Sequence, residues 1–199
     1  IFVQESIYDK FKSAFLKKTK TLIVGDPKDE SSNLGALVSK EHLERVLLKT
    51  KKAIKSGACL LFGGKRIVLK GGLSGGYYMS PTILENTKHT DLINQEEVFG
   101  PVVTLIPFKS EKNVIKMCNS TKYGLSASIF SNNISRAHRV AAQIDAGVVW
   151  INSWLLRDLR IPFGGMKSSG LGREGGYNSL NFFTETKNVC VKIEKEGNK

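Results

Sequence analysis

One segment of the sequence combines side chains that can bind a sugar and a flat ring. Residues 94–101 read N-Q-E-E-V-F-G-P, so the carboxylate of Glu97 stands two positions before the aromatic ring of Phe99. A carboxylate can accept two hydrogen bonds from a vicinal diol such as a ribose, and an aromatic ring can pack on a flat heterocycle. The segment precedes an apolar run, a junction where α/β proteins commonly present functional side chains. The same residues also fit a helix end with a solvated acidic pair, and the spacing leaves both interpretations open.

A second segment has the composition of a site for an acidic ligand. Residues 154–160 read W-L-L-R-D-L-R, which places Arg157 and Arg160 in an otherwise apolar stretch. Arginine grips carboxylates with two parallel hydrogen bonds, and an apolar rim strengthens the contact by excluding water. In the alternative interpretation Asp158 pairs with one of the two arginines. The other arginine would then still be free to meet an acidic ligand.

Other chemistries are excluded by spacing. Gly170–Gly175 matches G-x-G-x-x-G, but it follows a loop rather than a strand, so we expect no dinucleotide fold there. Gly165–Gly170 has the gap of a P-loop, yet Leu171 and Gly172 stand where Lys and Ser or Thr are required. The three histidines are scattered, so we expect no metal site. The three cysteines are Cys59, Cys118 and Cys190; they are odd in number and widely spaced, and they predict reduced core residues in a cytoplasmic protein.

The elements that must position these residues alternate between helix and strand, which is typical of an α/β fold with a mostly parallel sheet and flanking helices. After an opening strand, the apolar periodicity predicts helices over 5–18, 39–55, 110–119, 135–145 and 178–183, with Ser39 as an N-cap. Strands are expected at 58–62, 66–69, 78–84, 102–108, 126–130 and 147–152. The order from Val102 to Asn152 is that of a βαβαβ unit.

Residues 161–199 differ from the rest of the chain in composition and periodicity. Residues 161–176 are glycine-rich and lack periodicity, which indicates a functional ordered loop. The alternation of Val189, Val191 and Ile193 predicts a final strand over 188–193, and a strand needs a neighbour to pair with. We therefore divide the chain into a domain over 1–160 and, over 161–199, a loop, a short helix and an arm that pairs with another subunit.

Composition and charge narrow the classes of partner. The 199 residues carry 30 Lys and Arg against 18 Asp and Glu, a net charge of +12. The basic residues are dispersed over helix faces and ends without interleaved aromatic residues, so we expect no nucleic acid as a partner. No window approaches the roughly 18 to 20 apolar residues of a membrane span, so we expect no membrane partner. The chain begins with Ile1, and we expect it to be a piece of a longer protein.

Several motifs taken together resemble one enzyme family over nearly the whole chain. They are 96–101 (EEVFGP), 123–125 (YGL), 146–152 (AGVVWIN) and 162–165 (PFGG), followed by Lys167, Ser169-Gly170 and 172–174 (GRE). In this order and spacing they resemble the C-terminal half of the NAD(P)-dependent aldehyde dehydrogenase superfamily. Residues 152–154 (NSW) with 156–160 (LRDLR) are similar to the branch that oxidises 2-aminomuconic and 2-hydroxymuconic semialdehydes.

The resemblance implies a set of binding residues. Glu97 matches the carboxylate that holds the nicotinamide ribose, and Phe99 matches the aromatic residue beside the nicotinamide. His42 and Arg45 match positions that can reach the cofactor. Phe163 matches an aromatic residue of the substrate tunnel, and Arg157 occupies a tunnel position that is often apolar, which implies a substrate ending in a carboxylate.

The resemblance also implies an activity. In this family a cysteine thiolate attacks the aldehyde, a hydride passes to NAD, and glutamate-activated water hydrolyses the thioester. The nucleophilic cysteine and the base are expected upstream of Ile1, so this chain is expected to be inactive alone and to form part of a catalytic domain with a C-terminal oligomerisation strand.

The implied protein is a cytoplasmic, NAD-dependent semialdehyde dehydrogenase of kynurenine catabolism that forms a homodimer or homotetramer. The alternatives are a non-catalytic truncated subunit that acts through oligomerisation, or a dehydrogenase for another aliphatic or retinoid aldehyde.

Overall fold

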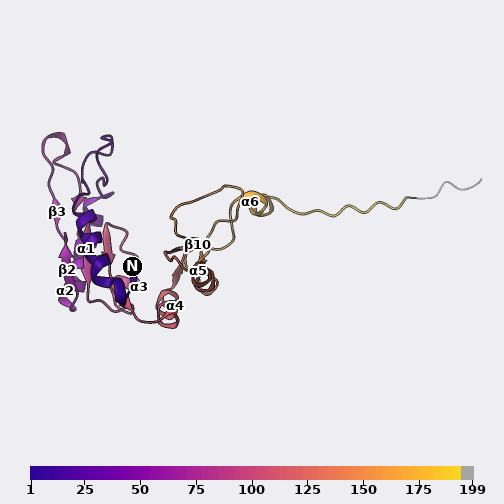
Figure 1. Ribbon diagram of the computed structural model, residues 1–199. Coiled ribbons are helices and arrows are strands. Elements are labelled where there is room, and N and C mark those ends of the chain that lie inside the picture. Colours follow the sequence, from indigo (N-terminus) through magenta and orange to yellow (C-terminus); the bar gives the residue numbers. More distant parts are fainter. Residues whose placement is uncertain (194–199) are drawn as a thin grey trace, which may run out of the picture. The chain divides into compact units, whose positions relative to one another are not determined.

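The computed structural model describes residues 1–193 of the chain (Figure 1). It contains two compact units, the first over Ile1–Thr121 and the second from Lys122 onward. This boundary differs from the expected division at residue 160. The reason is that the glycine-rich loop returns to the start of the second unit, where Met166–Lys167 pairs with Tyr123–Gly124.

The first unit contains both helices and strands, as the α/β pattern predicts. In chain order its elements are β1 (Phe2–Gln4), the short 3-10 helix η1 (Glu5–Ile7), α1 (Tyr8–Thr19), α2 (Lys40–Lys55), β2 (Cys59–Phe62), β3 (Arg66–Ile67), the 3-10 helix η2 (Gly71–Leu73), β4 (Tyr78–Met79), β5 (Thr82–Glu85), α3 (Leu92–Gln95), β6 (Val102–Thr104), β7 (Ile106–Phe108) and α4 (Glu111–Asn119).

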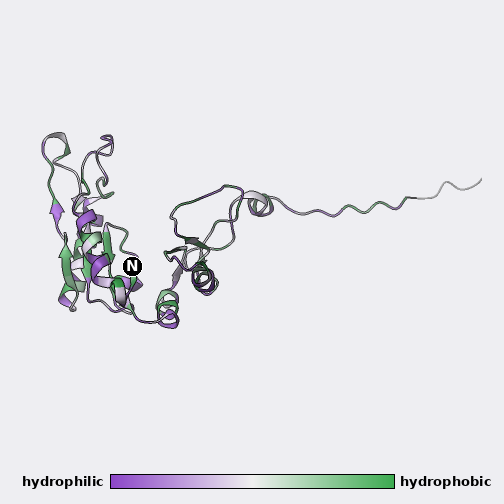
Figure 2. Ribbon diagram, viewed as in Figure 1, coloured by the Kyte–Doolittle hydropathy of each residue, from purple (hydrophilic) through white to green (hydrophobic). Residues whose placement is uncertain are grey.

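The main sheet of this unit has the strand order β2-β5-β6. β5 pairs antiparallel with β2 and parallel with β6, with Thr82 opposite Val102. Two further pairs are β1 with β7, which is parallel, and β3 with β4, which is antiparallel. Figure 2 colours much of the main sheet as apolar, and Ile83 and Leu84 are almost wholly buried in it. The α/β class is confirmed, whereas the sheets are mixed rather than mostly parallel.

Helix α2 closes the core of the first unit. Leu43 and Val46 project from one face of α2 and pack with Met79, and all three side chains are at most 2% exposed. Val98 and Val102 pack against this cluster from the segment that follows α3. Burial of such side chains contributes roughly 1.5–3 kcal/mol each. The segment that carries Glu97 and Phe99 is thus anchored in the core.

The second unit is built around one parallel strand pair. Its elements are β8 (Tyr123–Gly124), β9 (Ser126–Ile129), α5 (Ile134–Ala141), β10 (Val148–Ile151), β11 (Met166–Lys167) and α6 (Gly176–Phe183). β9 and β10 pair in parallel across the α5 connection, with Ser126 opposite Val148. The second half of the expected βαβαβ run is confirmed, and its first strands and helix lie in the first unit.

Two other expected elements differ from the structure. Helix α5 ends at Ala141, not at Asp145, because Gln143 and Ile144 turn back onto the carbonyls of Val140 and Ala141. Residues 184–193 form no strand, because within the described chain they have no neighbouring strand to pair with. They run extended from α6 in Figure 1.

The expectation that the cysteines are core residues is wrong. Cys59 and Cys190 are exposed, Cys118 is half-buried, and all three are free thiols. Cys59 opens β2, the edge strand of its sheet, so only one side of this strand has a neighbour.

Candidate functional site

The candidate cofactor residues of the first unit lie where α2 meets the segment before β6. Ser39 caps α2 as expected, because its Oγ accepts a hydrogen bond of 3.1 Å from the backbone N–H of His42. The residues His42, Arg45 and Lys49 then follow along the helix at spacings that place them on related faces. The cap therefore fixes where the helix begins and which side chains reach the neighbouring segment.

His42 connects α2 to the backbone of Phe99. Its ring is buried, and Nε2 lies 2.6 Å from the Phe99 carbonyl oxygen, while Nη2 of Arg45 lies 2.6 Å from Nδ1. Because a guanidinium can only donate, Nδ1 must accept, which leaves the proton on Nε2 to be donated to the carbonyl. Arg45 thereby fixes the tautomer that holds Phe99.

Phe99 is held in an unusual conformation with its ring outward. Its φ is +54° and the residue is 73% exposed. The rings of His42 and Phe99 meet edge to face, and their centres are 6.0 Å apart. The following residue, Gly100, lies so close to α2 that an added Cβ would stand 2.9 Å from Cγ1 of Val46. The chain therefore turns sharply against the helix and presents the aromatic face to solvent.

Glu97 is exposed and its carboxylate is available to a ligand. Within residues 1–193 its carboxylate makes no hydrogen bond or ion pair. Its carbonyl oxygen accepts a 3.1 Å hydrogen bond from Nζ of Lys49, which also pairs at 3.0 Å with Glu96. The structure thus brings Glu97, Phe99, His42 and Arg45 to one place on the first unit, and it adds Lys49, which sequence reasoning missed. The signal was present, because Lys49 stands about two helical turns after His42.

The candidate substrate residues lie together in the second unit. The guanidinium of Arg157 stacks on the ring of Phe163, with Cζ 3.9 Å from the ring centre, and Nη2 pairs with the carboxylate of Glu174. Phe163 and Glu174 also exchange two backbone hydrogen bonds of 2.8 Å. Glu174 is a second residue that sequence reasoning missed, since nothing in the spacing joins it to Arg157.

The second arginine of this segment is occupied. Arg160 Nε lies 2.9 Å and 3.1 Å from the two carboxylate oxygens of Asp158. The side chain and backbone N–H of Arg160 lower the pKa of the Asp158 carboxyl. The internal pair considered from sequence is confirmed, but the expectation of a leftover arginine is wrong, because Arg157 pairs with Glu174.

The loop after β10 holds these residues on a defined turn. Asn152 has a φ of +52°, and its side-chain amide bonds both the N–H and the carbonyl of Ser131. The indole N–H of Trp150 donates to the carbonyl of Leu156 at 2.8 Å. Beyond these anchors the apolar side chains of the loop point outward, with Trp154 and Leu156 more than 70% exposed.

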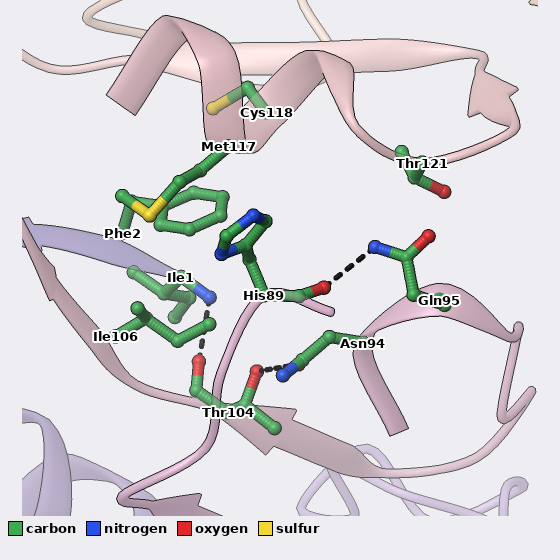
Figure 3. Close-up of a pocket in the computed structure, with 10 residues that line it drawn as sticks. All are labelled: Ile1, Phe2, His89, Asn94, Gln95, Thr104, Ile106, Met117, Cys118 and Thr121. Carbon is green, nitrogen blue, oxygen red and sulfur yellow. Dashed lines mark hydrogen bonds between the residues drawn. The ribbon is translucent and has the colours of Figure 1, made fainter. Parts of the chain in front are cut away.

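A small cavity of about 190 Å³ opens beside β1 in the first unit (Figure 3). Its polar contacts are internal, since Gln95 Nε2 donates to the His89 carbonyl and Thr104 Oγ1 to Oδ1 of Asn94, each at 2.6 Å. Cys118 lines it, and burial raises the pKa of this thiol. The nucleophilic thiolate is therefore disfavoured at Cys118.

Neither a cluster of metal-ligating side chains nor a membrane-spanning helix occurs among the described residues. Among residues 1–193, no three His, Cys, Asp or Glu side chains lie close enough to share a metal ion. In the same range, no helix has the length and apolar character needed to span a bilayer.

Comparison with known proteins identifies relatives along nearly the whole chain. The sequence model described as the aldehyde dehydrogenase family matches residues 1–189. The chain is 47% identical over 194 residues to 2-aminomuconic semialdehyde dehydrogenase from Bos taurus, and 44% identical over 193 residues to 2-hydroxymuconic semialdehyde dehydrogenase from Pseudomonas sp. strain CF600. These alignments cover 96% and 97% of this chain but only 40% of each relative, so the chain spans well under half of their length.

Solved structures of aldehyde dehydrogenases share the fold of this chain. A solved NAD+ complex of an aldehyde dehydrogenase from Bacillus cereus matches with a TM-score of 0.90 and 38% identity. The match covers 97% of this chain and 38% of that one.

Proposed function

The chain belongs to the aldehyde dehydrogenase family, and we propose that it forms part of an NAD-dependent enzyme that oxidises a carboxylate-bearing semialdehyde to the acid. The observation that carries this proposal is the exposed carboxylate of Glu97 beside the outward ring of Phe99 on a backbone fixed to α2. The printed names of the relatives support the substrate class, because they are 2-aminomuconic and 2-hydroxymuconic semialdehyde dehydrogenases. On the basis of the first of these names, we propose that the enzyme acts in tryptophan catabolism through kynurenine.

The residues of the first unit fit the nicotinamide ribose end of NAD. An ionised carboxylate without an internal partner can accept hydrogen bonds from both ribose hydroxyls, and an exposed ring can pack against the flat nicotinamide. Once bound, NAD accepts the hydride that leaves the aldehyde carbon. The part of this chain in that step is to orient the ribose and to cover one side of the ring.

The residues of the second unit fit the far end of the substrate. A guanidinium has five N–H donors in a planar fork, and Glu174 engages Nη2 of Arg157. We propose that the remaining donors bind the terminal carboxylate of the semialdehyde. Phe163 already holds the guanidinium over its ring, so less side-chain entropy is lost when the substrate binds.

We propose that this chain carries none of the family's bond-making residues. The resemblance assigns none of its cysteines to the nucleophile that forms the thioester, and none of its glutamates to the base that activates water. We therefore propose binding roles for Glu97, Phe99, His42, Arg45, Arg157 and Phe163, and no catalytic residue.

Product formation in the complete enzyme tests the proposed activity. We expect NADH to form with NAD+ and a muconic semialdehyde, and to form much more slowly with a retinoid or an uncharged aliphatic aldehyde of similar length. Oxidation of the uncharged aldehydes without oxidation of either muconic semialdehyde would replace the proposed substrate class by one of these alternatives.

Arg157→Gln is expected to raise KM for the muconic semialdehyde roughly tenfold, because a charge-assisted hydrogen bond to a carboxylate is lost. KM for NAD+ should stay the same. Arg160→Gln is the matched control, since it removes a guanidinium from the same loop that is already paired with Asp158. Equal substrate KM values in the parent enzyme and Arg157→Gln would refute the carboxylate role.

We also propose that residues 188–193 pair with another subunit in a homodimer or homotetramer. Val189, Val191 and Ile193 alternate with polar residues and are 71–88% exposed, which is typical of a strand that lacks its neighbour. The same exposure favours the second candidate function, a subunit piece that acts only through assembly.

Val191→Lys tests this arm by placing a charge on its apolar side. We expect the association constant of the complete enzyme to fall roughly tenfold or more, because a lysine on a strand opposes pairing. Light scattering during size-exclusion chromatography over a dilution series measures it, with Lys192→Gln as the control on the other side of the arm. An unchanged dissociation profile for Val191→Lys would count against the arm.

Finally, we propose a cytoplasmic location. Cys59 and Cys190 are exposed free thiols, which persist most readily in a reducing compartment.

A further inference from the structure

We infer that Lys49 is a positioning residue for the cofactor, which acts by fixing the orientation of Glu97 from behind. This inference rests on the proposed function, because it concerns how the Glu97 carboxylate is aimed at the nicotinamide ribose. The carboxylate of Glu97 is exposed and has no internal partner within residues 1–193. Binding of a ribose diol nevertheless requires this carboxylate to be held in one position.

The orientation of an unsupported side chain depends on the peptide planes beside it. Nζ of Lys49 accepts no bond and donates to the carbonyl oxygen of Glu97 at 3.1 Å, which restrains the peptide plane directly after Glu97. That plane sets ψ of Glu97 and hence the direction in which its Cβ leaves the backbone. Lys49 therefore acts on the carboxylate without contacting it.

The lysine is itself held in place. Its Nζ pairs with a carboxylate oxygen of Glu96 at 3.0 Å, and its side chain is only 27% exposed. One ammonium group thus joins two consecutive residues of the segment. A surface ion pair alone contributes little to stability, so we expect this arrangement to act on the geometry of the segment rather than on its stability.

Lys49 completes a pair of attachments with His42. The two side chains stand about two turns apart on α2. His42 donates to the carbonyl of Phe99 and Lys49 donates to the carbonyl of Glu97, two residues earlier in the segment. Two turns span about 10 Å whereas two extended residues span about 7 Å, and the long stem of a lysine covers the difference. Between the two attachments Val98 packs into the core. His42 by itself fixes only the Phe99 end, and Lys49 supplies the restraint at Glu97.

The test compares KM for NAD+ with kcat in the complete enzyme. Lys49→Met keeps the apolar stem and removes the donor, and we expect KM for NAD+ to rise about fivefold with kcat changed less than about twofold, because roughly 1 kcal/mol of orientation is lost in binding. Lys49→Arg restores a cationic donor and should return KM to within about twofold of the parent value. Lys51→Met is the matched control, since it removes one charge from an exposed position on the other side of α2.

The outcomes separate this inference from the proposed function. If Glu97→Gln leaves KM for NAD+ unchanged, the cofactor role of Glu97 fails and the proposed function with it. If Glu97→Gln raises KM while Lys49→Met does not, or if Lys49→Met lowers kcat and the melting temperature without changing KM, the positioning role alone is overturned. Lys49→Gln is too short to reach both acceptors and carries the same expectation should the methionine variant not fold.

Discussion

Gly147→Ala is expected to destabilise the second unit by more than about 3 kcal/mol, because there is no room for a side chain at this position. A Cβ on Gly147 would stand 1.6 Å from the carbonyl oxygen of Gly164, and the backbone N–H of Gly147 is already bonded to the carbonyl of Gly124. The obstacle is backbone on both sides, so no side-chain rotation can relieve it. Either β10 or the glycine-rich loop must move.

The displaced loop is the one that carries Phe163, so we expect a second effect on the substrate site. The muconic semialdehyde should bind more weakly to Gly147→Ala even at temperatures where the protein is still folded, because Arg157 stacks on Phe163. Thermal melting of the complete enzyme and KM for the aldehyde measure the two effects.

A glycine elsewhere provides the control for Gly147→Ala. A Cβ on Gly75 meets no atom within 4 Å, and we expect Gly75→Ala to change stability by less than about 0.5 kcal/mol. A melting temperature for Gly147→Ala that equals that of Gly75→Ala would contradict the packing described here.

Glu97→Gln is expected to raise KM for NAD+ about 10- to 100-fold, since a hydrogen bond to a charged acceptor contributes roughly 1.5–3 kcal/mol. Glutamine has the same shape but only one accepting oxygen and no charge, so it cannot offer a separate charged acceptor to each hydroxyl of a ribose. The carboxylate of Glu97 is exposed and has no partner within residues 1–193, so its loss should leave the melting temperature unchanged.

Initial rates at varied NAD+ measure the effect of Glu97→Gln. Glu44→Gln is the matched control, because Glu44 lies on the exposed side of α2 and pairs only distantly, at 3.9 Å, with Lys40. A KM for NAD+ within about twofold of the parent enzyme would remove Glu97 from the cofactor site.

Local sequence patterns were sufficient to predict the elements that depend on interactions between residues near in sequence, such as capping and apolar periodicity. Helix α2 is predictable because Ser39 caps it and Leu43 and Val46 recur at the helical period. The segment with Glu97 and Phe99 is recognisable because a carboxylate, an aromatic ring and a Gly-Pro break stand together before a strand.

Contacts between distant residues were not predictable in this way. The pairing of Arg157 with Glu174 requires the glycine-rich loop to return, and that return depends on the antiparallel pair β8 and β11, each too short to have its own apolar pattern. The end of α5 at Ala141 is likewise set by turn hydrogen bonds, although the apolar spacing continues to Ile144.

Val98 makes the core and the cofactor site thermodynamically dependent on each other. It packs against Leu43, Val46 and Met79, while its two neighbours in sequence are the residues proposed to hold the ribose and the ring. A ligand that binds only the folded segment stabilises everything that must stay folded with it. We therefore expect saturation with NAD+ to protect the buried amides around Val98 from solvent exchange, and we expect substitutions that loosen the core to weaken cofactor affinity even though they never touch the cofactor.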